Sequence, residues 1–332
     1  MKLSIVVICW NDAKVIYNCL DSIFKETVGT SFEVIVSDNG STDGSIAEIR
    51  KRYPSVRIVE NGANLGFAKG NNAGIAVAQG DYVLILNPDT IIHYGALDEF
   101  IRFADERPEA GAYGCRVLNP DGSLQISARP RPTVLRELLA ALCVRWLGRI
   151  STALAADSYV GWNADTERTV DWQSGCCILF QRKLLKQLQG FDERFFYHFE
   201  ETDLCFRVWK SGAPVLFCPT AKITHLGGQS VGRFPIRFVL ETYRSRYRYF
   251  YKHYGSRGAT QIRWIAILHL AIRKFGYGLL RWFKKDERLE NRLAMYRVAL
   301  KWNLQLDPIE FVKTGQEPDL GYAPLAPTPK LA

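Results

Sequence analysis

Three carboxylates crowd into four residues, at Glu200, Glu201 and Asp203. They follow an aromatic run, and such crowding is costly unless a metal, cations or a helix N-terminus share the charge. A carboxylate held in this way can take a proton from a hydroxyl, which is the task of a general base. The alternative is the acidic first turn of an ordinary helix, with Asp203 paired to Arg207 four residues later.

Another acid, Asp89, follows the apolar run Tyr82 to Leu86. Five apolar residues in a row predict a strand buried on both faces. Pro88 lacks the N–H that a ladder needs, so the strand should end there. Asp89 would then lie at a carboxyl strand end, where open α/β sheets bind ligands. We predict that it holds a divalent metal against a nucleotide diphosphate; the alternative is a turn that binds nothing.

The elements around these acids alternate between strand and helix patterns. Apolar, β-branched runs predict strands at 3–9, 32–36, 56–59 and 82–86, and helical spacing of apolar residues appears at 15–24 and 68–78. Strands separated by helices imply parallel pairing through right-handed crossovers. The expected fold class is therefore α/β.

Two loops rich in small polar residues follow predicted strands, at 38–45 and 64–72. Asp38 can accept hydrogen bonds from a base or ribose, whereas a simple turn followed by a helix cap explains the same residues. Neither a GxGxxG nor a GxxxxGK[ST] motif occurs, which argues against dinucleotide and P-loop sites.

The bulk composition is that of a folded protein, with 47% hydrophobic residues in a chain of 332. Eight cysteines are scattered without a CxxC pair, which predicts reduced core thiols in a cytoplasmic protein. The opening run, Met1 to Trp10, is expected to be a first strand and not a signal peptide. No apolar run of about 18 residues occurs, so no membrane-spanning helix is predicted.

As a set, these motifs resemble glycosyltransferase family two, and its rhamnosyltransferase-like branch in particular. The resemblance rests on four segments: Ser4–Val7, Ser37–Gly44, Asn64–Asn72 and Asn87–Asp89. It implies a GT-A fold, with a Rossmann-like, mostly parallel central sheet and flanking helices. It also implies a nucleotide-sugar donor, a divalent metal (Mg²⁺ or Mn²⁺) and inversion at the anomeric carbon.

The resemblance also assigns roles to individual positions. Asp38 would meet the nucleobase, and Asp89 would be the metal-binding acid of an Asp-x-Asp motif whose first acid is replaced by Asn87. Glu201 would be the catalytic base, in a position usually held by Asp, with Glu200 as the alternative. The segment 219–230 matches an element whose histidine, His225, joins the metal site. The donor-binding candidates are Asp38, Asn39, Gly66, Lys69, Asn71 and Asn87, and the catalytic candidates are Glu201, Glu200 and Asp203.

The resemblance covers about residues 1–232, which we expect to form the catalytic domain. Residues 1–118 would be the nucleotide-sugar-binding half, and 119–232 the acceptor and catalytic half with a helical insert at about 133–150. A basic, aromatic helical region would follow at 233–314, and a disordered, proline-rich tail at 315–332.

The positive charge of the chain belongs to that basic region. Between Arg237 and Lys285 stand 12 Lys or Arg and one acid, which gives +11 in a chain whose net charge is +9. Arg273 and Lys274 interrupt the apolar run 264–283, so spanning a bilayer is disfavoured. Contact with an anionic membrane surface fits better. A helix pair with a solvated basic face is the alternative; nucleic acid is disfavoured because no nucleic-acid motif occurs.

We therefore predict an inverting, metal-dependent glycosyltransferase. The first choice of donor is dTDP-rhamnose, and the acceptor is a hydroxyl of a cell-envelope glycan or a polyprenyl-diphosphate-linked sugar at the inner membrane face. A donor of the UDP-galactose or UDP-galactofuranose type is one alternative. The other is an inactive nucleotide-sugar-binding or membrane-surface protein, which Asn87 and Glu201 would motivate because they depart from the family pattern.

Overall fold

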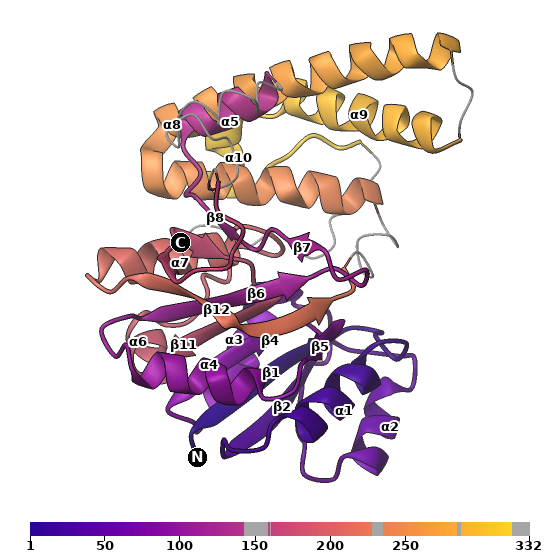
Figure 1. Cartoon of the computed structure of the whole chain (residues 1–332). Coiled ribbons are helices and arrows are strands. Elements are labelled where there is room, and N and C mark those ends of the chain that lie inside the picture. Colours follow the sequence, from indigo (N-terminus) through magenta and orange to yellow (C-terminus); the bar gives the residue numbers. More distant parts are fainter. Residues whose placement is uncertain (143–158, 160, 228–234, 284–286, 321–332) are drawn as a thin grey trace. The chain divides into compact units, whose positions relative to one another are not determined.

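The computed structural model describes residues 1–142, 159, 161–227, 235–283 and 287–320 (Figure 1). The chain divides into two compact units. The first comprises Met1–Arg131, Gly161–Phe196 and Glu200–Gln229, and the second comprises Pro132–Val160, Tyr197–Phe199 and Ser230–Ala332. Of the predicted insert, helix α5 (Val134–Ala141) is described and belongs to the second unit, while 143–150 lie outside the described residues. The predicted tail is described only for 315–320, which have no regular secondary structure.

The first unit is built on one large mixed sheet (Figure 1). Its strand order is β3 (Arg57–Glu60), β2 (Phe32–Asp38), β1 (Leu3–Cys9), β4 (Tyr82–Leu86), β11 (Cys177–Gln181), β6 (Ala112–Leu118), β12 (Val215–His225) and β5 (Thr90–Ile92). The first four strands are parallel, as the crossover argument predicts. Strand β11 enters antiparallel between β4 and β6. The carboxyl ends of β1, β2 and β4 therefore share one edge.

Short strands complete the architecture of this unit. β7 (Leu124–Gln125) pairs with β6, and β9 (Arg168–Thr169) pairs with β12. β8 (Ala128–Arg129) and β10 (Trp172–Gln173) form a separate two-stranded sheet.

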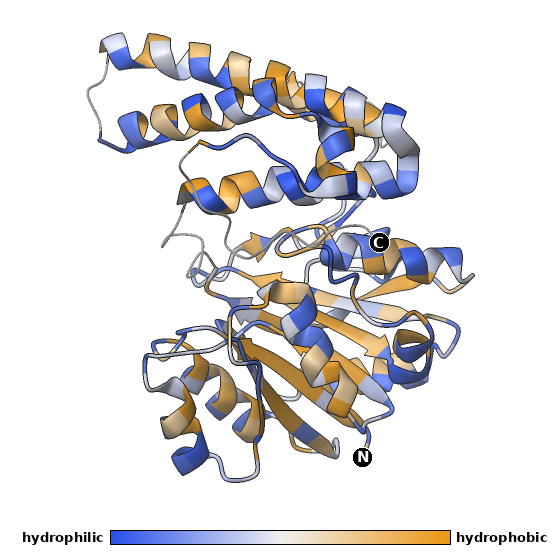
Figure 2. Cartoon of the chain, turned by 180° about the vertical axis from the view of Figure 1, so that it is seen from behind, coloured by the Kyte–Doolittle hydropathy of each residue, from blue (hydrophilic) through white to orange (hydrophobic). Residues whose placement is uncertain are grey.

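Helices cover both faces of the large sheet because its strands are apolar on both sides. Ile5 and Val7 of β1 belong to the main core, which includes residues from α1 (Ile16–Glu26) and α4 (Ala96–Asp105). On the opposite face α3 (Gly66–Val77) packs so closely that a Cβ on Gly74 would lie 2.4 Å from Val6. The other helices are α2 (Ser45–Arg52), α6 (Arg182–Gln187) and α7 (Glu200–Lys210). Figure 2 shows the sheet strands as almost uniformly hydrophobic.

The described part of the second unit is helical. α8 (Pro235–Phe283) is broken at Gly255, whose φ of 69° and ψ of −169° are not helical. α9 (Glu287–Gln305) runs antiparallel to the second half of α8, because Arg281 pairs with Glu290 at one end while Arg263 donates to the Asn303 carbonyl at the other. α10 (Pro308–Thr314) begins with Pro308 after the cap residue Asp307.

The loop before α3 depends on two glycines with left-handed backbones. Gly62 has φ +72° and open space where a Cβ would be. Gly66 has φ +81°, and a Cβ there would lie 2.5 Å from both the ring and the carbonyl oxygen of Phe196. The neighbouring Phe67 N–H donates to that same carbonyl at 2.8 Å. Gly66 therefore allows the loop to meet the segment that leads into α7.

Replacing these two glycines by alanine should separate backbone strain from steric conflict. Gly62→Ala should cost about 1–2 kcal/mol, the cost of a left-handed non-glycine residue. Gly66→Ala adds a backbone collision and should cost about 2 kcal/mol more. Urea unfolding of both variants measures the difference. Equal losses of stability would contradict the close approach of Phe196.

Candidate active site

The residues predicted to meet the donor lie in loops at the carboxyl ends of β1 and β2. Asp38 ends β2 and is buried, and its Oδ1 accepts a hydrogen bond from the Ser41 N–H at 3.0 Å. Asn11, after β1, holds the same loop because its Oδ1 accepts from the Thr42 N–H at 2.7 Å. Asp38 is thus fixed at the edge where β1 and β2 end, and its contact with a nucleobase stays a prediction.

The other predicted donor-binding residues are placed differently. Asn39 is buried and braces the two loops, since its Nδ2 donates to the Gly66 carbonyl and its Oδ1 accepts from Asn61. Asn71 is fully buried in α3 and donates to the Phe67 carbonyl at 2.9 Å. Lys69 is exposed. Only Lys69 of these three presents its side chain to solvent. Asn39 stabilises the loops, whereas Asn71 bonds within α3 and its buried Oδ1 has no hydrogen-bond partner among the described residues.

Asp89 and His225 are brought together by the pairing of β5 with β12. The antiparallel register places His225 opposite Thr90, and the Leu226 N–H donates to the Asp89 carbonyl at 2.9 Å. His225 Nε2 then lies 3.2 Å from Asp89 Oδ1. The same nitrogen lies 3.3 Å from Asn87 Nδ2. The two predicted metal ligands, which are 136 residues apart in the sequence, are therefore neighbours.

Gln125 fixes the orientation of the His225 ring. Its Nε2 donates to Asn119 Oδ1 at 2.8 Å, so its Oε1 faces His225 Nδ1 at 2.7 Å. An acceptor there requires the proton on Nδ1 and leaves the Nε2 lone pair directed at Asp89 and Asn87.

This arrangement fits a divalent cation with help from the donor. Two ligands at about 2.1 Å and at right angles are about 3 Å apart, which is close to the spacing of Asp89 Oδ1 and His225 Nε2. No group of three or more His, Cys, Asp or Glu side chains among the described residues is suited to hold a metal. Two protein ligands suit a metal that also binds phosphate oxygens of a nucleotide.

Glu201 lies at the N-terminus of α7, where its side chain is nine-tenths buried. Burial raises the pKa of its carboxyl, while backbone N–H groups and the charge of Arg129 oppose that rise. Its Oε2 has no hydrogen-bond partner among the described residues. A carboxylate with a raised pKa and one open oxygen has the properties of a general base.

The two neighbouring acids are buried as well. Asp203 has no exposed side-chain surface, and Arg207 Nε donates to its Oδ2 at 2.8 Å. Arg207 also donates to the Leu188 and Gly190 carbonyls, so this ion pair anchors α7 to the preceding loop, in agreement with the predicted i,i+4 pairing. Glu200 is 3% exposed and stays the alternative base.

The backbone directly before these acids is strained. His198 and Phe199 both have positive φ, at 66° and 69°. Non-glycine residues in this region cost about 1–3 kcal/mol each, and such strain collects at functional sites. The strained pair sets the point at which α7 begins, and therefore where Glu201 lies.

Cys176 links the metal-site acid to the predicted base. The pKa of its thiol is raised to about 12, mainly by burial and in smaller part by the nearby charges of Asp89 and Glu201. The Cys176 carbonyl also accepts from the Asn87 N–H at 3.0 Å, which continues the pairing of β4 with β11. Asp89 and Glu201 therefore lie near one thiol, at the end of the same strand pair.

The sequence matches the family described as Glycosyl transferase family 2 over residues 4–188, more than half of the chain. The chain belongs to this family. It is 33% identical over 252 residues to an N-acetylglucosaminyl-diphospho-decaprenol L-rhamnosyltransferase of Mycobacterium tuberculosis, with 72% of this chain and 81% of that protein covered. It is 25% identical over 201 residues to the rhamnosyltransferase WbbL of Escherichia coli, with 58% and 72% covered.

Solved structures show the same fold. A mannosyltransferase of Pyrobaculum calidifontis, in complex with GDP-Man and Mn²⁺, aligns with a TM-score of 0.52, 16% identity and coverage of 90% of this chain and 86% of that one. Residues 1–349 of S. aureus TarS align with a TM-score of 0.51, 15% identity and coverage of 91% and 90%. The predicted GT-A fold is confirmed, and this glycosyltransferase family 2 chain is a glycosyltransferase.

Sequence reasoning missed two residues of the site. Gln125 contacts His225, and Arg129 is close enough to Glu201 to lower its pKa. Both follow the Asn119–Ser123 turn, in β7 and β8. The signal for Gln125 was weak, because its contact with His225 depends on the pairing of β7, β6 and β12.

Removing the buried charge at position 201 should stabilise the protein. Glu201→Gln keeps the shape and should raise the melting temperature at pH 7, because the folded state favours the protonated form of Glu201. A tenfold change in proton affinity corresponds to about 1.4 kcal/mol, and about 1 kcal/mol corresponds to about 2–4 °C in Tm.

The gain should depend on pH in a defined direction. It should be absent below the unfolded-state pKa of Glu201, grow as the pH rises above it, and level off above the raised folded-state pKa. Thermal melts of both proteins between pH 4 and 8 measure this dependence. A constant difference across that range would contradict the raised pKa.

Proposed function

We propose that the protein transfers rhamnose, with inversion, from a nucleotide diphosphate donor to a hydroxyl of a lipid-linked acceptor. The observation that carries the chemistry is the buried Glu201 carboxylate, which has an open oxygen and shares the surroundings of Cys176 with Asp89. The sugar and the acceptor class come from the names of the two rhamnosyltransferase relatives. The first of these is named for an acceptor that is a sugar linked through a diphosphate to a polyprenol, N-acetylglucosaminyl-diphospho-decaprenol.

The reaction is a single displacement. Glu201 takes the proton of the acceptor hydroxyl as that oxygen forms a bond to the anomeric carbon. The bond from this carbon to the phosphate oxygen breaks on the opposite face, and the nucleoside diphosphate leaves with the electron pair. The attacking oxygen, the anomeric carbon and the leaving oxygen are in line in such a displacement, which inverts the anomeric configuration.

Asp89 and His225 would hold a divalent metal together with the donor's phosphates. A metal bound there supplies positive charge that stabilises the leaving diphosphate. Asn87 would orient the histidine through its amide, and Gln125 would do so through the acceptor that faces Nδ1. Asp38 would meet the nucleobase at the end of β2. Mg²⁺ and Mn²⁺ are the candidate metals.

The lipid tail of such an acceptor implies work at a membrane face. We place the enzyme peripherally on the inner face, where nucleotide sugars are made and anionic lipids are present. No described helix has the length and apolarity needed to cross a bilayer.

Two other assignments are distinguished by simple assays. A UDP-galactose or UDP-galactofuranose donor would keep the same site chemistry. An inactive sugar-nucleotide-binding protein would bind a donor without releasing nucleotide. A thermal-shift panel of sugar nucleotides with and without Mn²⁺, followed by nucleotide release and acceptor transfer with polyprenyl-diphosphate-linked N-acetylglucosamine, tests the proposal. Transfer from dTDP-rhamnose supports it, and nucleotide release from another donor alone contradicts the sugar assignment.

Loss of the base and loss of the metal ligand should have different effects. Glu201→Gln should lower kcat at least a hundredfold while dTDP-rhamnose affinity changes little, because the acid acts only on the acceptor proton. Asp89→Ala should abolish both transfer and metal-dependent donor binding. Steady-state kinetics and calorimetry measure these effects. Near-wild-type turnover by Glu201→Gln would move the base to Glu200.

Gln125 offers a test of the metal site that is independent of turnover. Gln125→Leu removes the acceptor that holds the Nδ1 proton of His225, and should weaken Mn²⁺ binding to the enzyme–dTDP complex about 10–100-fold. Gln125→Glu keeps an acceptor there and should retain the affinity. Calorimetric titration of Mn²⁺ measures both variants. Unchanged Mn²⁺ affinity in Gln125→Leu would show that His225 orientation does not govern the metal.

A further inference from the structure

The second half of α8 carries a continuous row of exposed apolar side chains. Its members recur every three or four residues, so they share one face of the helix. They are Trp264, Leu268, Ile272, Phe275, Leu279 and Trp282, and we call this row the apolar stripe. The 18 residue steps from Trp264 to Trp282 span about 27 Å of helix at 1.5 Å per residue. Exposure is greatest near the end, with Phe275 at 69% and Trp282 at 85%.

This exposure is not a consequence of poor packing in the hairpin. The opposite side of the same helix is closed, because Ile262, Ala266 and Leu270 are each 1% exposed. On α9, Leu293 and Ala299 are buried too. The hairpin thus has a formed core, and the apolar stripe remains exposed beside it. Folded monomers rarely leave an apolar surface of this extent open unless it binds something.

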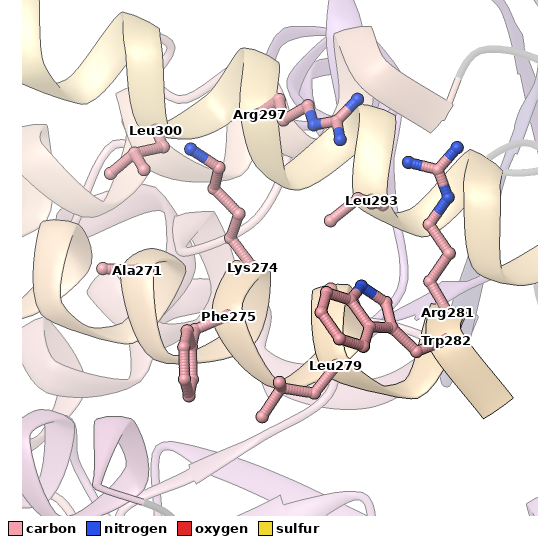
Figure 3. Close-up of a pocket in the computed structure, with 10 residues that line it drawn as sticks. Ala271, Lys274, Phe275, Leu279, Arg281, Trp282, Leu293, Arg297 and Leu300 are labelled. Carbon is pink, nitrogen blue, oxygen red and sulfur yellow. The ribbon is translucent and has the colours of Figure 1, made fainter.

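Cations flank the stripe. Residues 263–283 contain four Lys or Arg and no acid. Lys274 and Arg281 of α8 and Arg297 of α9 border a cavity of about 500 Å³, whose other walls include Phe275, Leu279 and Trp282. Figure 3 shows the three cationic side chains in its upper part and Phe275, Leu279 and Trp282 below them. Arg281 pairs with Glu290 at 2.6 Å, whereas Lys274 and Arg297 form no ion pair among the described residues.

We propose that the apolar stripe and its cationic rim are a docking surface for a bilayer that contains anionic phospholipid. The helix would lie in the plane of the interface, with the stripe among the upper acyl carbons and Lys274 and Arg297 on lipid phosphates. Tryptophans at both ends of the stripe suit this depth, where such rings concentrate. The inference goes beyond sugar transfer, since it depends on exposed side chains of α8 whatever the acceptor is.

Charge complementarity selects this occupant over the others. A second copy of the chain would bring the same cations against one another. Nucleic acid would satisfy the cations but would leave the apolar stripe uncovered. An anionic bilayer matches both parts of the surface at once.

Flotation with phospholipid vesicles tests the proposal. The wild-type protein should bind vesicles of phosphatidylcholine with about 30% phosphatidylglycerol at low salt, and pure phosphatidylcholine much less. The double variant Phe275→Ser/Trp282→Ser should lose about tenfold or more in partition coefficient. Tyr94→Ser is the matched control, because it removes an aromatic side chain that is 78% exposed in the other unit.

The cationic rim has its own variant and control. Lys274→Gln/Arg297→Gln should weaken binding to the anionic vesicles about tenfold or more, at roughly fivefold per cation. Lys183→Gln/Lys186→Gln makes the same change of charge on α6 and should bind as the wild type does. If both double variants weakened vesicle binding equally, the binding would depend only on the net charge of the protein and not on the cationic rim, which would overturn the proposal.

Three other results would also overturn it. The first is that the wild-type protein does not bind the vesicles. The second is that it forms a dimer, which Phe275→Ser/Trp282→Ser converts to a monomer, and does not bind vesicles. The third is that it binds nucleic acid but not vesicles. Nucleotide release from the donor in the absence of vesicles is measured in parallel. It should be unchanged in the stripe variants, so failure of the docking proposal and failure of the proposed transfer are distinguishable.

Discussion

The site depends on hydrogen bonding along both edges of β4. On one edge β4 pairs in parallel with β1, which leads to the donor-side loops. On the other edge it pairs with β11, and the Asn87 N–H continues this ladder to the Cys176 carbonyl. β4 ends at Leu86, and because Pro88 has no N–H to continue the ladder, Asp89 lies just beyond the end of the strand. Cys176, on the partner strand, lies near both Asp89 and Glu201, so one ladder sets the relation between the metal site and the base.

The first half of the fold is readable from local patterns. Apolar runs and helical spacing predict β1, β2, β3, β4, α1 and α3 close to their observed bounds, since each is a short, strongly patterned element. The second half is different. β12 pairs with β6, β5 and β9, and no local pattern states which strands an eleven-residue strand will join. The pairing of His225 with Asp89 was therefore expected from the family motif, while Gln125 had no motif to reveal it.

Burial explains why some predicted site residues serve the scaffold. Asn39 and Asn71 belong to two segments whose composition predicts donor contacts, yet both are buried: the Asn39 amide is occupied by the Gly66 carbonyl and Asn61, and the Asn71 Nδ2 donates within its own helix. The sequence shows the residue types but not the direction of a side chain. Asp203 is the opposite case, since its spacing from Arg207 already indicated the ion pair that is observed.

Two opposing influences act on the pKa of Glu201 because its carboxyl is buried, which would not be so for a carboxylate at the surface. Desolvation favours its neutral form, whereas Arg129 and backbone N–H groups at the start of α7 favour the charged form. If the charge were stabilised fully, the carboxylate would be a weak base; if it were not stabilised at all, the base would be protonated at neutral pH. These opposing influences leave the pKa of Glu201 raised, which is the direction that strengthens a general base. The two positive-φ residues directly before α7, His198 and Phe199, are a further cost in stability next to the same acids.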